Sequence, residues 1–356
     1  MLPRIKRFQQ LLTHSRLDAY LVTAEKDVSY LLQFPSADSW LLVSSRQFFY
    51  VTDARYTQEV KQQFPDVKIF EHQGAIVKGV ASLMRRSHIR KLGFDSRTLS
   101  LAQFKEMKQA RPTGTQLISC DRVVEAMRQI KDAEEISRIQ ACLAVNLAAY
   151  DYIEPLLQPG MSERVVLKLL EDFVAKRGVK FAFPPIVASG PNSAFPHARV
   201  MERNLSKNEV VLIDLGIEQD GYKSDLTRIF FLGKIPPLLK KRYIFLKEAQ
   251  AAAIAAVRPG VAAAAVDAVA RNQLNKNKLA SYFTHSLGHG VGLDVHEAPR
   301  ISKTSSAVLK EGMVFTVEPG IYFPGQYGLR VEDMVVVTGN GCEVLSRSAR
   351  ENFCTR

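Results

Sequence analysis

The sequence predicts an α/β protein made of two domains, at residues 1–122 and 123–356. Three observations lead to this prediction. The chain has 356 residues, which is too long for one small domain. Helix-like and strand-like patterns alternate along it, as they do in α/β proteins. In the second part, a pair of helical stretches around a Pro-Gly step occurs twice, which indicates an internal duplication.

The first domain is predicted to be an α/β unit with its own core. Apolar residues at helical spacing mark a helix between Ile5 and Leu12, and Ile76–Met84 is amphipathic. A hairpin is expected around Ser44–Arg46. The expected strands are Ala19–Val22, Trp40–Val43, Phe48–Val51, Val67–Phe70 and Lys91–Phe94. The histidines and carboxylates of this domain lack the spacing of metal ligands, so we interpret them as structural.

The second domain begins with helices that have clear end signals. Asp132 and Glu135 have the form of a capping box at the start of a long helix. The Pro-Gly steps are Pro159-Gly160 and Pro259-Gly260, and the helices beside them are expected at Ser162–Arg177, Glu248–Val257 and Ala262–Leu274. If the two halves are related, a functional site is expected where they face each other.

The composition excludes several classes of protein. About 46% of the residues are apolar, as in soluble globular chains, and no apolar run approaches the length of a membrane span. The net charge is +12, and residues 1–122 carry +8 from 19 basic and 11 acidic residues. These basic residues are scattered and no nucleic-acid-binding motif accompanies them, so we expect neither a nucleic-acid nor a membrane partner. The widely spaced cysteines indicate a cytoplasmic protein without a disulfide framework.

Two aspartates stand out in a predicted hairpin. Two apolar strands flank a four-residue turn, Glu218–Gly221. If the residues that border this turn pair with each other, Asp214 lies directly opposite Asp225, with Cβ atoms about 5 Å apart. Two ionised carboxylates on apolar strands repel each other and resist burial. A bound cation would supply the missing positive charge, so this pair predicts a metal site.

More carboxylates occur in the second half of this domain. Glu318 ends an apolar strand, and Glu332 is expected within another. Strand alternation places Arg330 and Glu332 on the same face. Each residue alone would be unremarkable, because a glutamate near a strand end is usually solvated. Their combination with the aspartate pair makes them candidate ligands.

Histidines complete this set of candidates. His285, His289 and His296 fall within 12 residues of the chain, among several glycines. Glycine lets the backbone approach a site closely, and neutral imidazole is a common metal ligand. A fourth histidine, His197, lies in a loop rich in glycine, proline and asparagine, which is expected to project it from the surface.

These residues resemble those of a known family, the pita-bread metallopeptidases, which include methionine aminopeptidase, prolidase and aminopeptidase P. In order and local context, the matching ligand set is Asp214, Asp225, His289, Glu318 and Glu332. The motifs that carry the resemblance are Ser224–Arg228, Gly288–Gly290, Val295–Glu297, Glu318–Gly320 and Arg330–Glu332. The resemblance covers nearly the whole chain. It implies a creatinase-like N-terminal α/β domain and a pita-bread catalytic domain with duplicated, pseudo-twofold halves.

The resemblance also implies an activity, that of an Xaa-Pro aminopeptidase. Such an enzyme removes the first residue of a peptide whose second residue is proline. Two divalent metal ions per chain are implied, with Mn²⁺ first and Zn²⁺, Co²⁺ or Fe²⁺ as alternatives, and they would activate a hydroxide. Asp225 and Glu332 would bridge the two ions, Asp214 would complete one of them, and His289 with Glu318 would complete the other.

Further roles follow from the same resemblance. Glu318 would also shuttle the proton to the leaving prolyl nitrogen. His197, His285 and His296 would donate hydrogen bonds to carbonyl oxygens of the substrate and the tetrahedral intermediate. Arg330 would hold a carboxylate, either of the site or of the substrate. A homodimer is implied as well.

Two alternatives on the same fold stay open at this stage, besides a nucleic-acid-binding protein driven by the +8 charge of residues 1–122. The first is a prolidase, which cleaves Xaa-Pro dipeptides only. The second is a non-catalytic binding protein on the same fold, which the presence of all five ligands disfavours. The chain departs from the family pattern at Val200-Met201, Ser286-Leu287 and Ile229, which affects the substrate pocket more than the metal ligands.

Overall fold

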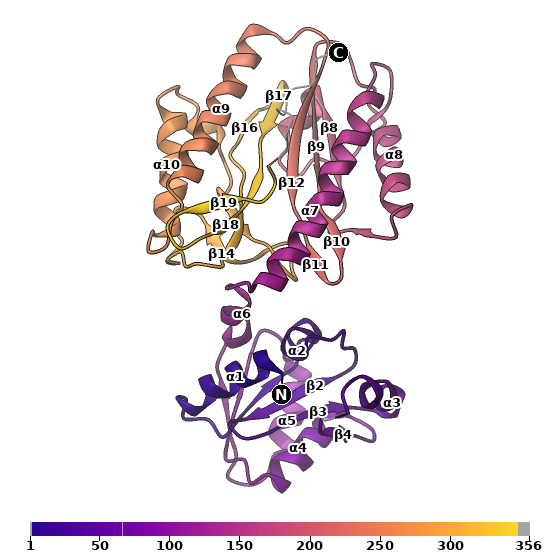
Figure 1. Cartoon of the computed structure of the whole chain (residues 1–356), viewed down its shortest axis with the longest axis vertical. Helices are drawn as coiled ribbons and strands as arrows, with labels where there is room; N and C mark the ends of the chain where they lie inside the picture. The colour runs from indigo at the N-terminus through magenta and orange to yellow at the C-terminus, as the bar shows by residue number, and fades with distance from the viewer. Residues whose placement is uncertain (1, 66, 348–356) are drawn as a thin grey trace. The chain divides into compact units, whose positions relative to one another are not determined.

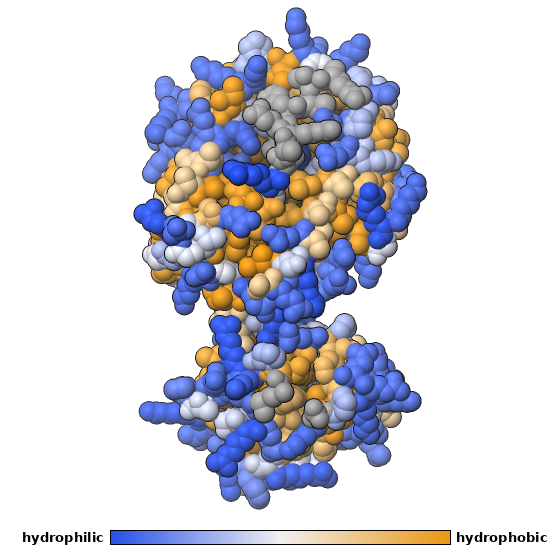
Figure 2. All heavy atoms as spheres, viewed as in Figure 1, coloured by the Kyte–Doolittle hydropathy of each residue, from blue (hydrophilic) through white to orange (hydrophobic). Residues whose placement is uncertain are grey.

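The computed structural model describes residues 2–65 and 67–347 and divides into two compact units, Met1–Arg128 and Gln129–Arg356 (Figure 1). The boundary expected after residue 122 precedes helix α6 (Val123–Arg128), which the structure groups with the first unit. Within the described residues, no helix combines the length and the apolar character that crossing a bilayer requires. On the face shown in Figure 2, hydrophilic side chains are spread over both units.

The first unit is a mixed sheet with strand order β4-β3-β2-β1-β5-β6 and helices packed on it (Figure 1). Its strands are β1 (Ala19–Val22), β2 (Trp40–Ser44), β3 (Phe48–Thr52), β4 (Ile69–Glu71), β5 (Lys91–Phe94) and β6 (Gln116–Ser119). Its helices before α6 are α1 (Pro3–Thr13), α2 (Glu25–Leu32), α3 (Ala54–Gln63), α4 (Ile76–Arg86) and α5 (Leu101–Ala110). Strand β1 is buried along its whole length, so the sheet forms the core of this unit.

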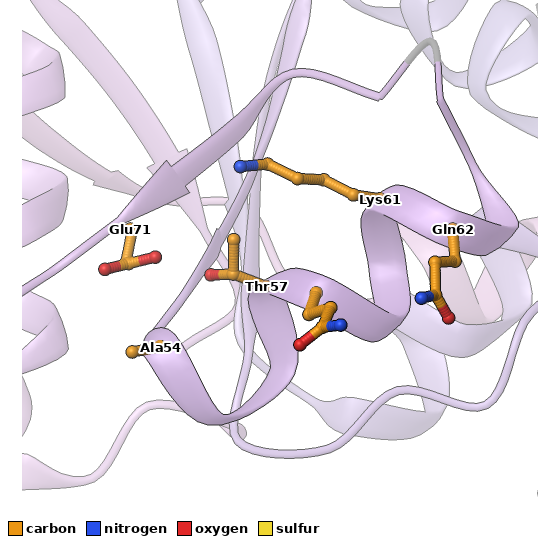
Figure 3. Close-up of a pocket in the computed structure, with 6 residues that line it drawn as sticks. Ala54, Thr57, Lys61, Gln62 and Glu71 are labelled. Carbon is orange, nitrogen blue, oxygen red and sulfur yellow. The ribbon is translucent and has the colours of Figure 1, made fainter.

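A pocket lies between α3 and β4 in the first unit (Figure 3). Its charged lining residues are Lys61 and Glu71, and Thr57 and two glutamines complete its polar wall. None of the residues predicted to carry chemistry lines this pocket. The predicted site belongs to the second unit.

The second unit contains two helix pairs with the strands between them (Figure 1). The helices are α7 (Ala133–Ile153), α8 (Glu163–Ala175), α9 (Pro237–Ala255) and α10 (Ala263–Asn275), with short 3₁₀ helices η1 (Glu154–Leu156), η2 (Gly190–Ala194) and η3 (Ala280–Tyr282). The strands of the first half are β7 (Lys180–Phe181), β8 (Ile186–Ser189), β9 (Glu209–Leu215), β10 (Ile217–Gln219), β11 (Tyr222–Lys223) and β12 (Leu226–Leu232). Those of the second half are β13 (Gly288–Gly290), β14 (Glu297–Ile301), β15 (Val314–Val317), β16 (Gly320–Phe323), β17 (Tyr327–Arg330), β18 (Asp333–Val337) and β19 (Cys342–Val344).

Each helix pair covers its own part of the sheets. Buried side chains of α7 and α8, such as Leu143 and Leu170, pack with Ile213 of β9 in one apolar cluster. Side chains of α9 and α10, such as Leu246 and Val266, form a second cluster with strands that include β15. Strand order is β12-β9-β8 in one sheet and β14-β13-β15-β18-β19 in another. The carboxylate-bearing segments lie in the middle of this arrangement.

The duplicated architecture is visible in matching local geometry. Gly160 and Gly260 both follow proline and both have positive φ, 92° and 83°, which glycine adopts without strain. The Gly160 amide donates to Leu205 O at 2.8 Å, and the Gly260 amide donates to Leu309 O at 2.9 Å. Isolated antiparallel bridges follow at equivalent places, Ser162 with Asn204 and Ala262 with Val308. The predicted internal duplication is therefore present.

Helix signals in the sequence are mostly confirmed. Asp132 and Glu135 form the expected capping box at the start of α7, with the Glu135 amide 2.9 Å from Asp132 Oδ1. Ser162 caps α8, and α10 begins one residue after its predicted start. Helix α9 begins at Pro237 and not at Glu248. The prediction was too short because basic residues in its first half hide the apolar stripe that faces the core.

The hairpin turn is shorter than predicted, and this shifts the register. Gln219 pairs with Tyr222 around a two-residue turn, Asp220-Gly221, whose φ angles are 51° and 79°. Asp-Gly favours such turns because both central residues need positive φ. Asp214 therefore pairs with Thr227, and the expected direct pairing with Asp225 is wrong. Asp225 lies instead in the bend between β11 and β12.

A second correction concerns the position of Glu332. The sequence predicted one continuous strand over residues 329–337, with Glu332 inside it. In the structure β17 ends at Arg330 and β18 begins at Asp333. The two strands belong to different sheets, and the chain bends between them. Glu332 and Asp225 thus both lie at bends, where a side chain is not confined to the face of a strand.

Candidate metal centre

The candidate ligands come from both halves of the second unit. Asp214 lies on β9, and Asp225 and Glu332 lie in the bends that lead into β12 and β18. His289 is the middle residue of β13, and Glu318 directly follows β15. Carboxylates of the first half therefore lie close to an imidazole and carboxylates of the second half.

The imidazole of His289 touches carboxylates from both halves. Its Nε2 lies 3.2 Å from Glu318 Oε1 and 3.6 Å from Asp225 Oδ2. Asp225, His289 and Glu332 each offer a ligand atom, and these atoms all lie within 4.8 Å of one another. Side-chain ligands of one divalent ion lie about 3 to 4.5 Å apart when each is about 2.2 Å from the ion. The group is compact enough to hold a metal ion.

The carboxylates are buried, and this changes their titration. Burial raises the pKa of Asp225 and of Glu332 well above the ordinary range, and neighbouring carboxylates raise both further. Burial also raises the pKa of Asp214, although the Arg330 guanidinium opposes it. Repulsion of this kind means that the cluster lacks positive charge. A divalent cation between the carboxylates would supply it.

Glu318 and His289 shift each other's pKa in opposite directions. Burial disfavours a charged Glu318, but the hydrogen bond and charge of His289 outweigh it and lower the pKa of Glu318 to about 2. Burial likewise opposes a charged His289, and Glu318 outweighs it and raises the pKa of the imidazole. Glu318 is therefore ionised at neutral pH.

In the described part of the second unit, two buried carboxylate oxygens have no hydrogen-bond partner. They are Asp214 Oδ1 and Glu332 Oε1, and each belongs to a residue less than 10% exposed. A buried charged oxygen without a partner is costly, on the order of several kcal/mol. Both oxygens belong to the predicted ligand set. Unsatisfied acceptors of this kind fit a bound cation better than they fit a purely structural cluster.

The second oxygen of each of these carboxylates is held in place. Arg330 Nη2 donates to Asp214 Oδ2 at 2.5 Å, and Thr227 Oγ1 donates to Glu332 Oε2 at 2.6 Å. Arg330 Nε donates in turn to Thr227 Oγ1 at 3.0 Å. One arginine and one hydroxyl therefore orient two carboxylates and leave one oxygen of each directed elsewhere. Hydrogen bonds of this kind fix ligand geometry in metal sites.

The ring of His289 is oriented by its own backbone. Its Nδ1 lies 3.2 Å from Gly290 O, and because a carbonyl only accepts, Nδ1 carries the proton. In the neutral ring, Nε2 is then the lone-pair atom, and it faces the carboxylates. The His289 amide also donates to Thr316 Oγ1, which donates to Glu318 Oε1 at 3.2 Å.

His285 reaches the cluster through a tyrosine. Its Nδ1 donates to Ser286 O at 2.8 Å, and its Nε2 lies 3.0 Å from the Tyr322 hydroxyl. Arg330 Nη1 donates to the same hydroxyl at 2.9 Å. Burial lowers the pKa of His285, so its ring is neutral and Nε2 accepts from Tyr322. Both ring nitrogens of His285 are therefore engaged.

His197 and His296 lie at the exposed side of the cluster. Both side chains are exposed, and the ring of His296 lies 4.1 Å from that of His289, centroid to centroid. Partial burial lowers the pKa of His296, and the charges of His289 and His197 act in the same direction. His197 is therefore within electrostatic reach of His296. Its neighbour Pro196 accepts a hydrogen bond from Arg330 Nη1 at 3.0 Å, which ties this loop to the ligands.

Sequence reasoning missed Thr227 and Tyr322. Thr227 belongs to the Ser224–Arg228 motif, but its place beside the cluster depends on its pairing with Asp214, which the incorrectly predicted turn concealed. Tyr322 follows Glu318 by four residues. Glu318 follows a strand of one sheet, and Tyr322 lies on a strand of another. A periodic sequence pattern describes one strand at a time, so it could not predict that the two side chains meet.

Comparison with known proteins agrees with this geometry. Residues 137–339 match the model of metallopeptidase family M24, and residues 4–130 match the Creatinase/Prolidase N-terminal domain. The chain is 34% identical to an Xaa-Pro dipeptidase of Pyrococcus horikoshii over 98% of both chains. The structure superposes with a TM-score of 0.93 on an Xaa-Pro dipeptidase from Bacillus anthracis, at 34% identity over 98% of each chain. An X-Pro aminopeptidase from Thermotoga maritima gives a TM-score of 0.90 at 32% identity, covering 98% of this chain and 100% of the other.

These matches cover both units and agree with the fold expected from the sequence. The first unit is the creatinase-like domain, and the second, with its duplicated halves, has the pita-bread architecture. The family model spans more than half of the chain and includes all five candidate ligands. The chain is therefore a hydrolase of metallopeptidase family M24.

Proposed function

We propose that this protein hydrolyses the peptide bond between the first residue of a peptide and a proline that follows it. The observation that carries the proposal is the buried cluster of Asp225, His289 and Glu332, whose ligand atoms lie within 4.8 Å of one another. The names of relatives that match almost the whole chain, Xaa-Pro dipeptidase and X-Pro aminopeptidase, support the choice of substrate.

The donor set fits two divalent cations. Four carboxylates and one imidazole make an oxygen-rich site, and four negative charges balance two dications. The unpartnered oxygens Asp214 Oδ1 and Glu332 Oε1 supply acceptors for them. In this proposal the residues that hold the ions are Asp214, Asp225, His289, Glu318 and Glu332. When bound, such ions lower the pKa of water so that a nucleophile is available near neutral pH.

Residues of the chain then bind the peptide and move its protons. Glu318 is ionised, so one of its oxygens would accept a proton from the attacking water and deliver it to the prolyl nitrogen as the peptide bond breaks. His197 and His296, exposed beside the cluster, donate hydrogen bonds to substrate carbonyl oxygens. His285 acts through the Tyr322 hydroxyl, which it and Arg330 hold in place. The nitrogen of an X–Pro peptide bond carries no hydrogen, so the site needs no hydrogen-bond acceptor for it.

Hydrolysis of peptides of defined sequence tests the proposal. The purified full chain is stripped with a chelator, reloaded with Mn²⁺ and given an Xaa-Pro dipeptide, an Xaa-Pro tripeptide and a Met-Ala peptide. We expect cleavage of Xaa-Pro substrates that depends on added metal, and little cleavage of Met-Ala. Equal cleavage of Met-Ala, or no cleavage of any Xaa-Pro substrate at saturating metal, contradicts the proposal.

Peptide length separates the two forms of this activity. The sequence favoured an aminopeptidase P, which accepts peptides of several residues. Two of the three relatives described above are Xaa-Pro dipeptidases, which favours a prolidase. The test uses a series of Xaa-Pro peptides from two to six residues long. A prolidase cleaves only the dipeptide, whereas an aminopeptidase P also cleaves the longer peptides.

The metal and the assembly are further parts of the proposal. We expect Mn²⁺ to support the highest activity when Mn²⁺, Zn²⁺, Co²⁺ and Fe²⁺ are compared at equal free concentration. We also expect a homodimer, which light scattering detects as twice the mass of the 39.8 kDa chain.

A further inference from the structure

A buried carboxylate outside the metal cluster holds the loop that carries His197. Glu163 is the first residue of α8 and is 0% exposed. Its Oε1 accepts from the Ser189 amide at 2.7 Å and from Ser189 Oγ at 2.8 Å. Its Oε2 accepts from Asn192 Nδ2 at 2.8 Å and from the Met201 amide at 2.9 Å. These four hydrogen bonds use both oxygens fully.

The partners of Glu163 stand at both ends of one loop. Ser189 ends β8, Met201 lies 12 residues later, and His197 is between them. Asn192 also donates to Arg199 O at 3.0 Å, which closes a smaller ring around the histidine. A loop of this length without such ties would sample many conformations. One carboxylate therefore fixes the backbone at both ends of the loop that carries His197.

The loop has a defined tie to the metal cluster, so its placement matters for the site. Pro196 O accepts from Arg330 Nη1, and the same guanidinium holds Asp214. Phe195 and His197 on either side of this proline are exposed, so they are available to a substrate. Among residues 2–65 and 67–347, the His197 ring has no hydrogen bond, ion pair or aromatic contact, so its position follows the backbone of this loop.

The second half of the unit uses a comparable device. Asp267 on α10 is 0% exposed and accepts from the Leu287 amide at 3.1 Å. Arg271, paired with Asp267 at 2.7 Å, donates to His285 O at 2.6 Å. In both halves, a buried carboxylate on the helix after the Pro-Gly step therefore fixes the backbone of a segment that carries a non-ligand histidine.

We propose that Glu163 is a positioning residue for the reaction, which places His197 against the substrate by fixing both ends of the 189–201 loop. This inference rests on the proposed function, because His197 is assigned there to the substrate carbonyl. Glu163 itself touches neither the ligands nor the substrate. It acts through the loop, so its effect on the reaction must depend on the presence of the His197 ring.

A double-mutant cycle tests that dependence. In Glu163→Gln an NH₂ group replaces one oxygen and faces two donors, so two of the four hydrogen bonds are lost while the side-chain volume is kept. We expect this change to lower kcat/KM on an Xaa-Pro substrate by about tenfold in the wild-type background, because small misplacements of a binding group are costly. In a His197→Ala background the same change is expected to lower it by less than about twofold. Equal factors in the two backgrounds would mean a merely structural role and overturn the proposal.

Matched variants keep the test decisive. Glu171→Gln changes an exposed glutamate on the same helix and is expected to leave kcat/KM unchanged. If Glu163→Gln does not fold, Asn192→Ala removes one partner of the carboxylate and enters the same cycle. Metal content is measured for each variant and is expected to match the wild type, because no ligand is altered.

A readout without substrate separates this inference from the proposed function. Hydrogen–deuterium exchange of the metal-loaded full chain is expected to rise about tenfold in residues 189–201 of Glu163→Gln and to stay unchanged in Glu171→Gln. Faster exchange without any Xaa-Pro activity in the wild type would sink the proposed function and leave the tie between Glu163 and the loop standing. Unchanged exchange in that loop would overturn the positioning role whatever the activity.

Discussion

Side chains at the site are of two kinds: candidate metal ligands, and residues whose hydrogen bonds orient those ligands. Asp214 and Glu332 each keep one oxygen without a hydrogen-bond partner among the described residues, and Arg330 and Thr227 donate to the other oxygen. Glu318 differs because His289 lowers its pKa to about 2. We therefore make one prediction for Glu318, as a carboxylate that transfers a proton, and another for Thr227, as a hydroxyl that orients a ligand.

Replacing Glu318 by glutamine removes both a proposed metal ligand and the proposed proton acceptor. At saturating Mn²⁺ we expect kcat on an Xaa-Pro substrate to fall by about 10² to 10⁴, the usual contribution of a positioned acid–base group. Steady-state kinetics measure it. Glu311→Gln, an exposed glutamate, serves as the control. A kcat within tenfold of wild type at saturating metal would show that Glu318 is not the proton shuttle.

Replacing Thr227 by valine keeps the shape of the side chain and removes the hydroxyl that bonds Glu332. Because a partner of this kind orients a ligand, we expect metal affinity to fall by about 10- to 100-fold. Thr227→Ser retains the hydroxyl and is expected to keep most of the affinity. Titration calorimetry with Mn²⁺ compares the two. Equal affinities for the valine and serine variants would argue against an orienting role.

At the scale of elements, close packing between backbone segments positions the candidate ligands. A Cβ added at Gly288, beside His289, would lie 1.8 Å from Thr316 O on the neighbouring β15. Backbone this close to backbone leaves room for glycine alone. The start of β14 is held differently, by an ion pair between Lys131 and Glu297 at 2.7 Å, with the side chains 1% and 5% exposed.

Gly288→Ala tests the first device. The added methyl group must push β13 away from β15, so we expect a loss of stability of about 1–3 kcal/mol, as for overpacked sites, together with weaker metal binding through His289. Gly341→Ala is the matched control, because nothing lies within 4 Å of its added Cβ. Chemical denaturation measures both. A Gly288→Ala protein as stable as Gly341→Ala would contradict the close approach of the two strands.

Lys131→Met tests the second device. Removing one partner of a buried ion pair leaves a charge in a poorly solvated place, so we expect a loss of about 3–5 kcal/mol. Lys207→Met, at an exposed position, is expected to change stability by less than about 0.5 kcal/mol. Denaturant titration decides between them. Equal effects of the two substitutions would mean that the Lys131–Glu297 pair carries little of the stability of this segment.

The sequence predicts features that depend on neighbouring residues, and it fails for features that depend on how strands pair or on which sheets meet. Capping at Asp132 is local, and the sequence shows it directly. The pairing of Asp214 depends on which residues form a turn, and the preference of Asp220-Gly221 for a two-residue turn moved it by two positions. Tyr322 joins the site across a sheet boundary, which no local pattern records.

At the scale of the whole molecule, the duplication places the site. Two halves with matching Pro-Gly turns and bridges each contribute candidate ligands, and His289 of the second half lies next to Asp225 of the first. The family resemblance led to the prediction that five residues form one ligand set, and the structure brings ligand atoms of Asp225, His289 and Glu332 within 4.8 Å of one another. The register, the bends at Asp225 and Glu332, and the Glu163 ties needed the three-dimensional structure.

The central claim is that five side chains of the second unit hold two divalent cations. Elemental analysis of the Mn²⁺-loaded, desalted protein tests it most directly, in the wild type and in Asp225→Asn, which removes one negative charge from a proposed bridging ligand. The account predicts about two ions per chain in the wild type and fewer than about one in the variant. A ratio near zero in the wild type, or equal ratios in both proteins, would contradict it.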